Sequence, residues 1–340
     1  MATKKYDFDV IALGDATLDT FLKLEDANVL CSINQEQCWL CLNYADKIPV
    51  SSLQHSLGGN AANLAVGAAR LGLVSAIYTE LGDDDTGGRI IRQFEQEGVD
   101  LAYVKTLRKK SSNYSVVINF KSQRTILGYH QKREYHFPKL GVARFIYLTS
   151  MGEGCESVYS ELLKYLHKNG TKLCFAPGTY QRRSGFKNLE PVISNSYLFI
   201  SNKEEACSIF SAQGGNLAKQ TGQDDKSFMK DLLYRIHRYG PEVVVVTDGP
   251  KGAYCYDGEN YYYAPIIPVE VVEPTGAGDS FSTGLIAGLV SGKKIDQSLV
   301  WAAYNSTSVI GHVGAQTGLL NQKKMREFHR KYSGYKVELF

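Results

Sequence analysis

The chain has 340 residues, which is enough for one large α/β domain or two smaller ones. Hydrophobic residues make up 44% of the sequence and charged residues 21%, as in ordinary globular proteins. A formal net charge of +3 with scattered lysines argues against a nucleic-acid partner, and no apolar run reaches the roughly 18 residues of a membrane span. Because the N-terminal segment also lacks the pattern of a signal peptide, we expect a soluble cytoplasmic protein without a membrane partner.

Strand and helix patterns alternate along most of the chain. Strands are predicted at residues 7–15, 75–82, 144–150, 172–177, 197–201 and 242–249. Helices are predicted at residues 60–72, 85–99, 156–170, 202–210 and 227–240. The strands are continuous apolar runs, so we expect an α/β fold of three layers, α/β/α, with a mostly parallel central sheet. In such folds ligands bind beyond the carboxyl ends of the strands.

Two segments interrupt this alternation. Residues 19–50 and 113–130 are rich in β-formers, and the second is predicted to be a hairpin that turns near residues 121–123. We predict that both segments pair into a small β-sheet that forms a lid on a single domain of residues 1–340. Because exposed sheet edges tend to find partners, we also predict a homodimer through the lid sheet.

The seven cysteines are odd in number and irregularly spaced, which is not typical of a disulfide framework. Cys38 and Cys41, with Cys31 nearby, suggest a metal site. A strand would point Cys38 and Cys41 to opposite faces, and a fourth ligand is missing locally. We therefore predict plain half-buried cysteines.

The stretch EPTGAGDSF, residues 273–281, follows a late hairpin at residues 252–272 and begins a helix of small residues. Its glycines permit a tight turn, and successive N–H groups at a helix start form an anion site. Taken alone, Asp279 is equally well explained as a helix cap. A P-loop would need a lysine after the glycines, and a dinucleotide fingerprint would need Gly or Ala where Phe281 stands, so neither motif fits.

A second motif favours a role for Asp279 beyond that of a helix cap. GGNAANLAVGAARLG, residues 58–72, is followed about 200 residues later by TGAGDSF, and together they resemble the two signatures of the ribokinase (PfkB) family of carbohydrate and nucleoside kinases. The resemblance extends over residues 14–319, from GDATLD to GAQTGL. It implies a ribokinase-like fold and the transfer of a phosphoryl group from ATP to a hydroxyl group.

By this resemblance Asp279 is the general base that accepts the proton of the substrate hydroxyl. The backbone N–H groups of Gly276, Ala277 and Gly278 would form the anion hole for the migrating phosphoryl group. A carboxylate among helix-terminal N–H groups should stay ionised near neutral pH. Family members carry an aspartate where this chain has Glu273, which puts the binding of a monovalent cation in doubt.

At the substrate end, the resemblance implies that Asp19 and Asn63 bind hydroxyl groups of the acceptor, a task for which ionised carboxylates are suited. The alternative for Asp19 is a turn aspartate. Asn60 stands where some family members carry a lysine, which favours a neutral acceptor. The predicted substrate-binding residues are Asp15, Asp19, Gly58, Gly59, Asn60 and Asn63.

At the nucleotide end, Glu205 follows Asn202 by three residues at a helix start, so both side chains share a face. By the resemblance Glu205 would hold Mg²⁺ through water; the alternative is an ordinary capped helix start. The predicted ATP-binding residues are Asn202, Thr247, Gly249, Gly252, Asn305 and Gly314.

We therefore expect a kinase that uses ATP and Mg²⁺ to phosphorylate a hydroxyl group of a small sugar. A nucleoside kinase of the same family is the first alternative. A sugar-phosphate kinase is the second, for which Arg124, Lys132 and Arg133 near the lid would supply positive charge. A protein that binds sugar or nucleotide without catalysis is the third.

Overall fold

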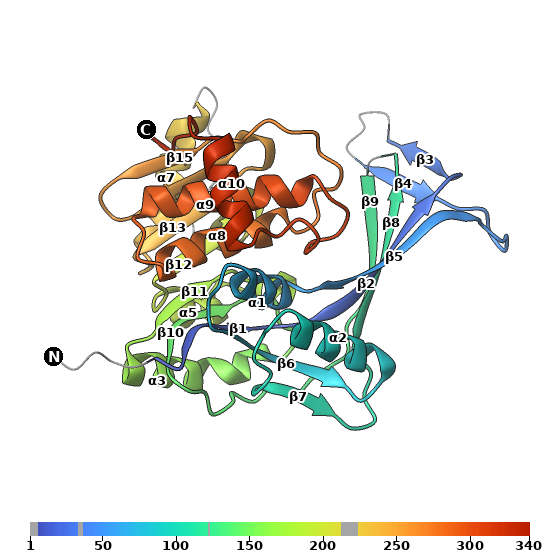
Figure 1. The fold of residues 1–340 in the computed structure, drawn as a ribbon, viewed down its shortest axis with the longest axis horizontal. Helices are drawn as coiled ribbons and strands as arrows, with labels where there is room; N and C mark the ends of the chain where they lie inside the picture. The colour runs from blue at the N-terminus through green and yellow to red at the C-terminus, as the bar shows by residue number, and fades with distance from the viewer. Residues whose placement is uncertain (1–5, 33–36, 122, 212–223) are drawn as a thin grey trace.

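The computed structural model describes residues 6–32, 37–121, 123–211 and 224–340. A ten-stranded sheet crosses the body of the molecule (Figure 1). Its strands are β1 (Phe8–Leu13), β6 (Ser75–Gly82), β7 (Val104–Leu107), β10 (Ala143–Leu148), β11 (Lys172–Phe175), β12 (Leu198–Asn202), β13 (Val243–Thr247), β14 (Ala253–Tyr256), β15 (Tyr261–Ala264) and β16 (Glu338–Leu339). Their order is β16-β15-β14-β13-β12-β11-β10-β1-β6-β7, parallel from β13 to β7 and antiparallel at β14 to β16.

Helices cover both faces of this sheet. One face packs against α1 (Asn60–Arg70), α2 (Asp85–Gln96), α8 (Ala277–Val290) and α9 (Ile295–Ile310). The other packs against η1 (Cys155–Val158), α3 (Tyr159–Asn169), α5 (Phe186–Ile193), α6 (Lys203–Ser211) and α7 (Asp225–His237). The remaining helices are α4 (Thr179–Arg183), η2 (Gly249–Lys251) and α10 (Gln322–Lys331). The prediction of three layers with a mostly parallel sheet is confirmed. Within the described residues, none of the helices has the length and apolarity needed to cross a bilayer.

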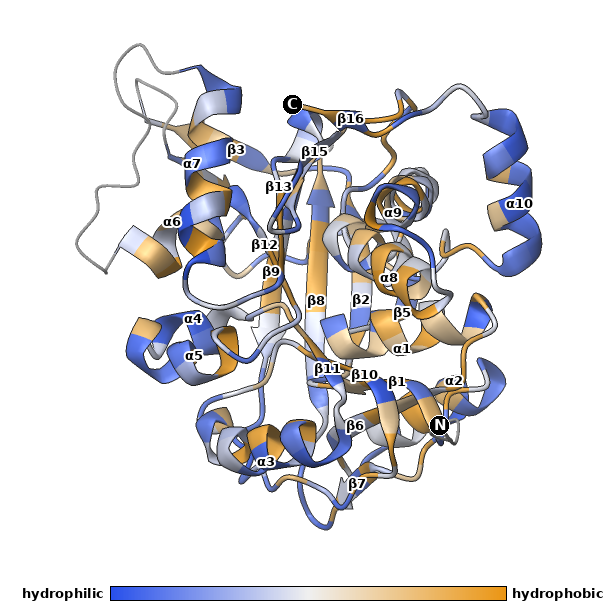
Figure 2. Cartoon of the chain, turned by 90° about the vertical axis from the view of Figure 1, so that its left-hand side faces the viewer, coloured by the Kyte–Doolittle hydropathy of each residue, from blue (hydrophilic) through white to orange (hydrophobic). Residues whose placement is uncertain are grey.

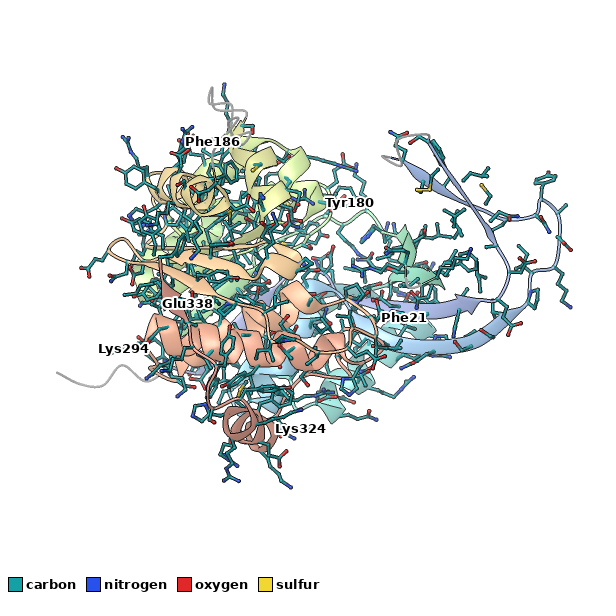
Figure 3. All side chains as sticks on the ribbon, turned by 90° about the horizontal axis from the view of Figure 1, so that it is seen from above. Phe21, Tyr180, Phe186, Lys294, Lys324 and Glu338 are labelled. Carbon is teal, nitrogen blue, oxygen red and sulfur yellow. A yellow bond between two sulfur atoms is a disulfide. The ribbon has the colours of Figure 1, made fainter. Side chains whose placement is uncertain are left out.

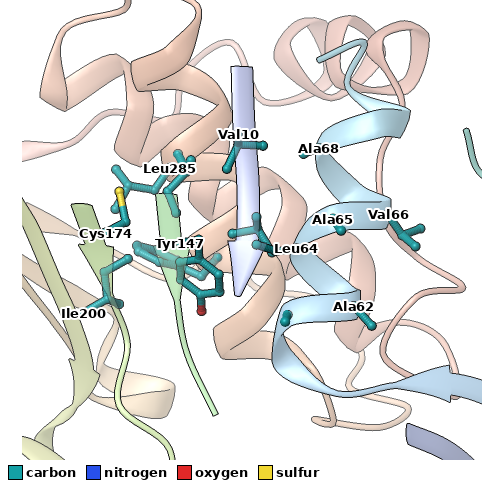
Figure 4. Close-up of a cluster of buried hydrophobic side chains, with 14 of the residues drawn as sticks. Val10, Ala62, Leu64, Ala65, Val66, Ala68, Tyr147, Cys174, Ile200 and Leu285 are labelled. Carbon is teal, nitrogen blue, oxygen red and sulfur yellow. The ribbon is translucent and has the colours of Figure 1, made fainter. Parts of the chain in front are cut away.

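Helices α1 and α8 pack closely together over β1 and β10. Leu64 of α1 and Leu285 of α8 are fully buried in the same apolar cluster as Val10 (Figure 4). Both helices are largely apolar along the sides that face the sheet (Figure 2). A Cβ at Gly67 would lie 2.5 Å from Cγ2 of Thr283, so the two helices approach closely because Gly67 has no side chain. This contact joins the two sequence motifs in space.

A four-stranded sheet stands beside the body and forms the lid (Figure 1). Its strands are β2 (Thr17–Leu24), β5 (Val50–Gly58), β8 (Asn113–Phe120) and β9 (Gln123–Tyr129), in the order β5-β2-β8-β9. The predicted lid sheet is confirmed, but its first segment continues beyond residue 50, because β5 runs antiparallel to β2 as far as Gly58. The predicted turn near residues 121–123 includes residue 122, which lies outside the described residues.

A two-stranded hairpin, β3 (Asn28–Cys31) and β4 (Cys38–Cys41), extends from the lid (Figure 1). Its register places Cys31 directly opposite Cys38, and the two form a disulfide. The prediction of plain half-buried cysteines is therefore wrong for this pair, and both side chains are exposed. The sequence argument failed because it considered Cys38 and Cys41 along one strand and not Cys31 across the hairpin.

Candidate active site

The start of α8 carries the predicted base and anion hole. Gly276 caps the helix with a φ of 79°, a left-handed conformation that glycine adopts without strain. The N–H of Ala277 donates to the carbonyl oxygen of Pro274 over 3.3 Å, whereas those of Gly278 and Asp279 have no acceptor among the described residues. No atom lies within 4 Å of the position that a Cβ on Gly278 would take. The helix start therefore offers unpaired N–H groups and open space to an anion.

Asp279 lies in the first turn of α8 and is oriented by α1. Asn63 donates its Nδ2–H to Asp279 Oδ2 over 2.8 Å. Burial raises the pKa of the Asp279 carboxyl to about 6, the Asn63 hydrogen bond lowers it, and the negative charge of Glu205 raises it. The carboxyl is therefore mostly ionised at neutral pH and close to the range in which a general base is most effective.

Asn63 belongs to a chain of hydrogen bonds that fixes its orientation. Its Oδ1 accepts from Nε2 of Gln316 over 3.0 Å, and the backbone oxygen of Gln316 accepts from Arg70 over 2.6 Å. Arg70 in turn pairs with Glu97 over 2.6 Å. Asn63 was predicted to bind a substrate hydroxyl; one of its N–H groups is bound to Asp279, which leaves its second N–H as a donor for the substrate. Gln316 was not predicted as a site residue.

Asp19 lies on β2, on the lid side of Asp279. Burial raises the pKa of Asp19 to about 6, the Ser115 hydroxyl lowers it, and the charge of Asp279 raises it, so the two carboxylates are close enough to interact. A Cβ at Gly58 would collide with the carboxylate of Asp19, which explains the glycine. The buried hydroxyl of Thr17 lies within reach of the Asp19 carboxylate, whose pKa it lowers. The sequence argument missed Thr17, although a strand places residues 17 and 19 on one face.

Asp15 lies at the end of β1, next to this group. It accepts a hydrogen bond from the Tyr135 hydroxyl over 3.0 Å, and burial raises the pKa of its carboxyl to about 7. Gly59 has a φ of 94°, and a Cβ there would collide with the backbone oxygen of Asp15. Asn60 is the first residue of α1 and is half-buried. Arg133 is only 4% exposed, and its Nε and Nη1 have no partner among the described residues.

The predicted magnesium residues cap α6. The N–H of Glu205 donates to Asn202 Oδ1 over 2.8 Å, and the N–H of Asn202 donates to Glu205 Oε2 over 3.2 Å. This reciprocal pair is a capping box in form, which was the alternative that the sequence left open. Yet Glu205 also acts on Asp279 through its charge and lies 3.3 Å from a guanidinium nitrogen of Arg182. Glu205 therefore lies near enough to Asp279 to affect it, and Arg182 is a neighbour that the sequence did not predict.

Thr247 and Asn202 are direct partners at the carboxyl ends of the parallel strands β13 and β12. Gly249 has a φ of 51°, and nothing lies within 4 Å of where its Cβ would be, so space remains beside its backbone. Gly252 has a φ of 88°, and a Cβ there would collide with the carbonyl oxygen of Ala264. Gly252 is thus required by packing, whereas Gly249 leaves room for a ligand.

Asn305 lies in the interior of the protein, against the first turn of α8. Its side chain is fully buried, donates to the carbonyl oxygen of Ser280 over 2.7 Å and accepts from the N–H of Leu320 over 2.9 Å. It ties α8 to the segment after α9. The assignment of Asn305 to ATP binding stays a prediction.

Gly314 lies beside Glu273. Its N–H donates to Glu273 Oε2 over 2.9 Å, and the hydroxyl and N–H of Thr275 donate to Oε1. The guanidinium of Arg124, from the lid strand β9, lies 4.0 Å from the same carboxylate. Glu273 is 5% exposed. Its charge is therefore balanced by protein donors on the body and by an arginine on the lid.

Comparisons with known proteins identify the family of the chain. The family model of the pfkB family carbohydrate kinases matches residues 21–322. An uncharacterized sugar kinase of Archaeoglobus fulgidus is 26% identical over 262 residues, which cover 75% of this chain and 98% of the relative. The structure of Arabidopsis thaliana ribokinase complexed with ribose and ATP superposes with a TM-score of 0.73 at 20% identity, covering 94% of this chain and 98% of that one.

The nucleoside kinase of Methanocaldococcus jannaschii, described as an archaeal member of the ribokinase family, superposes with a TM-score of 0.71. It is 19% identical, and the match covers 95% of this chain and 99% of that one. At such identities the two structural matches establish the fold, and the match to the family model establishes the family. The chain belongs to the pfkB family of carbohydrate kinases and is an ATP-dependent carbohydrate kinase.

Proposed function

We propose that Asp279 takes the proton from a hydroxyl group of a small sugar while that oxygen attacks the γ-phosphorus of ATP. The observation that supports this most directly is the position of Asp279. Its half-buried carboxylate has a pKa raised to about 6 and lies at a helix start whose neighbouring N–H groups are unpaired. A base and an anion hole side by side are the two parts that phosphoryl transfer to an alcohol requires.

The acceptor would lie between Asp279 and the lid. Asp19 would accept hydrogen bonds from sugar hydroxyls, the neighbouring hydroxyl of Thr17 would bind another, and the second N–H of Asn63 would complete the set. A nucleoside is the second candidate. It is favoured by Phe21, which lies two residues beyond Asp19 on the same face of β2 and would pack against a base.

The nucleotide would lie along the carboxyl ends of β12 and β13, with its phosphates at the start of α8. Glu205 and Asn202 supply the oxygen ligands that Mg²⁺ prefers, and they would hold it through water. The ion would neutralise charge on the phosphates of ATP. The anion-hole N–H groups would bind the γ-phosphoryl group while Asp19 and Asp279 orient the acceptor.

A panel assay tests this proposal. Release of ADP is measured with Mg²⁺ and ATP against free sugars, nucleosides and phosphorylated sugars. We expect turnover with at least one acceptor, and turnover that is lost in Asp279→Asn. If sugar or nucleotide binds but no acceptor gives turnover, the chain is a binding protein and the proposal fails.

A further inference from the structure

The segment that follows α9 contacts both the start of α8 and the side chain that binds Asp279. A Cβ on Gly276, which caps α8, would lie 2.5 Å from the Cβ of Ala315, so the two segments are in close contact. The next residue, Gln316, is 2% exposed and donates its Nε2–H to Asn63 Oδ1 over 3.0 Å. Asn63 in turn donates to Asp279. Two adjacent residues of one segment therefore support the anion hole and the proposed base.

The orientation of the Asn63 amide depends on its two partners. An ionised Asp279 can only accept hydrogen bonds, so Asn63 must turn its Nδ2 toward the carboxylate and its Oδ1 away from it. That oxygen then needs a donor, which is Nε2 of Gln316. The Oε1 of Gln316 accepts in turn from Nε2 of Gln93 over 3.5 Å. A residue at position 316 that could not donate would therefore remove the bond that favours this orientation of Asn63.

Arg70, in the last turn of α1, binds the backbone of the same segment. Its Nη1 donates to the carbonyl oxygen of Gln316 over 2.6 Å. Its Nε and Nη2 donate to the two carboxylate oxygens of Glu97, at the end of α2, over 2.8 and 2.6 Å. Because the donors of a guanidinium lie in a rigid plane, the paired contact with Glu97 directs Nη1 at Gln316.

We propose that Gln316 and Arg70 are positioning residues for the general base. Gln316 holds the amide of Asn63 in the orientation that donates to Asp279, and Arg70 holds Gln316. Arg70 lies about two helical turns beyond Asn63 on α1, so it acts through Gln316 and not on the reacting atoms. This inference rests on the proposed function, because it concerns the base of that reaction.

The test measures the pKa of the Asp279 carboxyl in the full chain by NMR with ¹³C-labelled aspartate, and the Asp279→Asn variant identifies the signal. Gln316→Met keeps the length of the side chain and removes its N–H donor. We expect the pKa of Asp279 to rise by roughly half a unit, because the Asn63 hydrogen bond lowers it in the wild type. With an acceptor, kcat should fall about tenfold while KM for ATP changes little.

Gln322→Met is the matched control. Gln322 is the first residue of α10 and donates its Nε2–H to the backbone oxygen of Leu71 at the end of α1, over 3.0 Å. Helix α10 lies at the edge of the body, where Lys324 is labelled in Figure 3. The control therefore removes the same kind of donor to α1 without touching Asn63, and it should leave kcat and the pKa of Asp279 unchanged.

Arg70→Lys is the second variant, and it keeps the test informative if Gln316→Met does not fold. Lysine retains the charge but lacks the planar fork, so it cannot bind Glu97 and Gln316 together in the same geometry. We expect the pKa of Asp279 to rise in this variant too, by less than in Gln316→Met. A wild-type pKa in Arg70→Lys would overturn the role assigned to Arg70.

Asn63→Ala, alone and combined with Gln316→Met, tests the route of the effect. If Gln316 acts through Asn63, the double variant should have the same pKa of Asp279 as Asn63→Ala alone. Asp19 and Glu205, whose charges interact with Asp279, remain in every one of these variants. A further shift in the double variant would show a direct effect of Gln316 and overturn the inference.

Two other outcomes would overturn the inference as well. One is an unmoved pKa of Asp279 in a folded Gln316→Met variant, and the other is an equal shift in Gln322→Met, which would indicate a general loosening of α1. Because the pKa is measured without turnover, these results are distinct from turnover that persists in Asp279→Asn, which would contradict the proposed function.

Discussion

The side-chain amide of Asn63 donates to the carboxylate of Asp279 over 2.8 Å, although the two residues are 216 positions apart in the sequence. The contact exists because Gly67 lets α1 approach α8. It links the glycine-rich motif of residues 58–72 to the late motif that begins α8, so each motif has a part in placing the Asp279 carboxylate.

Replacement of Asp279 by asparagine should lower kcat by about 10² or more, because an amide cannot accept the proton of the acceptor hydroxyl. ATP affinity should change little, since the unpaired N–H groups at the helix start remain. Steady-state kinetics and nucleotide binding measure the two effects separately. Turnover near the wild-type level would remove Asp279 from the role of base.

Replacement of Asn63 by alanine should move the acid limb of the pH profile of kcat upward. In the wild type, turnover should fall below about pH 6, where Asp279 becomes protonated. The Asn63 hydrogen bond lowers the pKa of Asp279, so its loss favours the protonated form and raises the pH that activity requires. A lower kcat with an unmoved pH profile would mean that Asn63 acts only on the packing of α1.

Replacement of Asp19 by alanine should raise KM for the acceptor and leave KM for ATP unchanged. Asp19 lies on β2 of the lid, whereas the proposed nucleotide residues lie at the ends of β12 and β13. Asp19→Asn, which keeps one hydrogen-bond acceptor, should be less severe. Initial rates at varied concentrations of each substrate separate the two constants. A rise in KM for ATP alone would place Asp19 on the nucleotide side.

Replacement of Asp15 by asparagine should stabilise the fold at neutral and alkaline pH. Burial raises the pKa of Asp15 from 3.8 to about 7, so between these values the folded chain binds more protons than the unfolded chain. The free energy of unfolding of the wild type therefore falls as pH rises through this window. The gain in Tm of Asp15→Asn should grow from pH 4 to pH 7. A gain in Tm that does not change with pH would contradict the raised pKa of Asp15.

The sequence predicted the alternation of β1, α1, β6 and α2 because each element has a clear apolar pattern. It did not predict α9, whose residues 295–310 include several serines, threonines and asparagines that favour caps and turns over helix interiors. These residues are helical here because tertiary packing buries them: Asn305 binds Ser280 and Leu320. Strand β5 was missed for a similar reason, since most of its residues are exposed and pair only with β2.

The motifs identified Asp279 and Asn63 but did not indicate which side chains hold them. Gln316 donates to Asn63, and Arg182 pairs with Glu205 nearby; each reaches the site from a distant part of the chain. The spacing of residues in a motif predicts contacts within one helix or strand. The contacts of Gln316 and Arg182 join different elements and depend on how those elements pack.

The outer face of the lid, opposite Asp19, is apolar and exposed. Leu53, Leu127 and Tyr129 are 58%, 57% and 52% exposed on this face. Exposed apolar surface of this kind is typical of an interface, so we expect two copies of the chain to pack through their lids. Light scattering should give a particle of twice 37.7 kDa.

A charge on this face should separate the copies. Leu53→Glu combined with Leu127→Glu should shift the wild-type dimer to a monomer, because two carboxylates would lose their hydration at the interface. Val74→Glu is the control, since Val74 is 54% exposed on the body and not on the lid. A wild-type chain that scatters as a monomer at all concentrations would show that the lid face has another use. A dimer that persists in the double variant would place the interface elsewhere on the molecule.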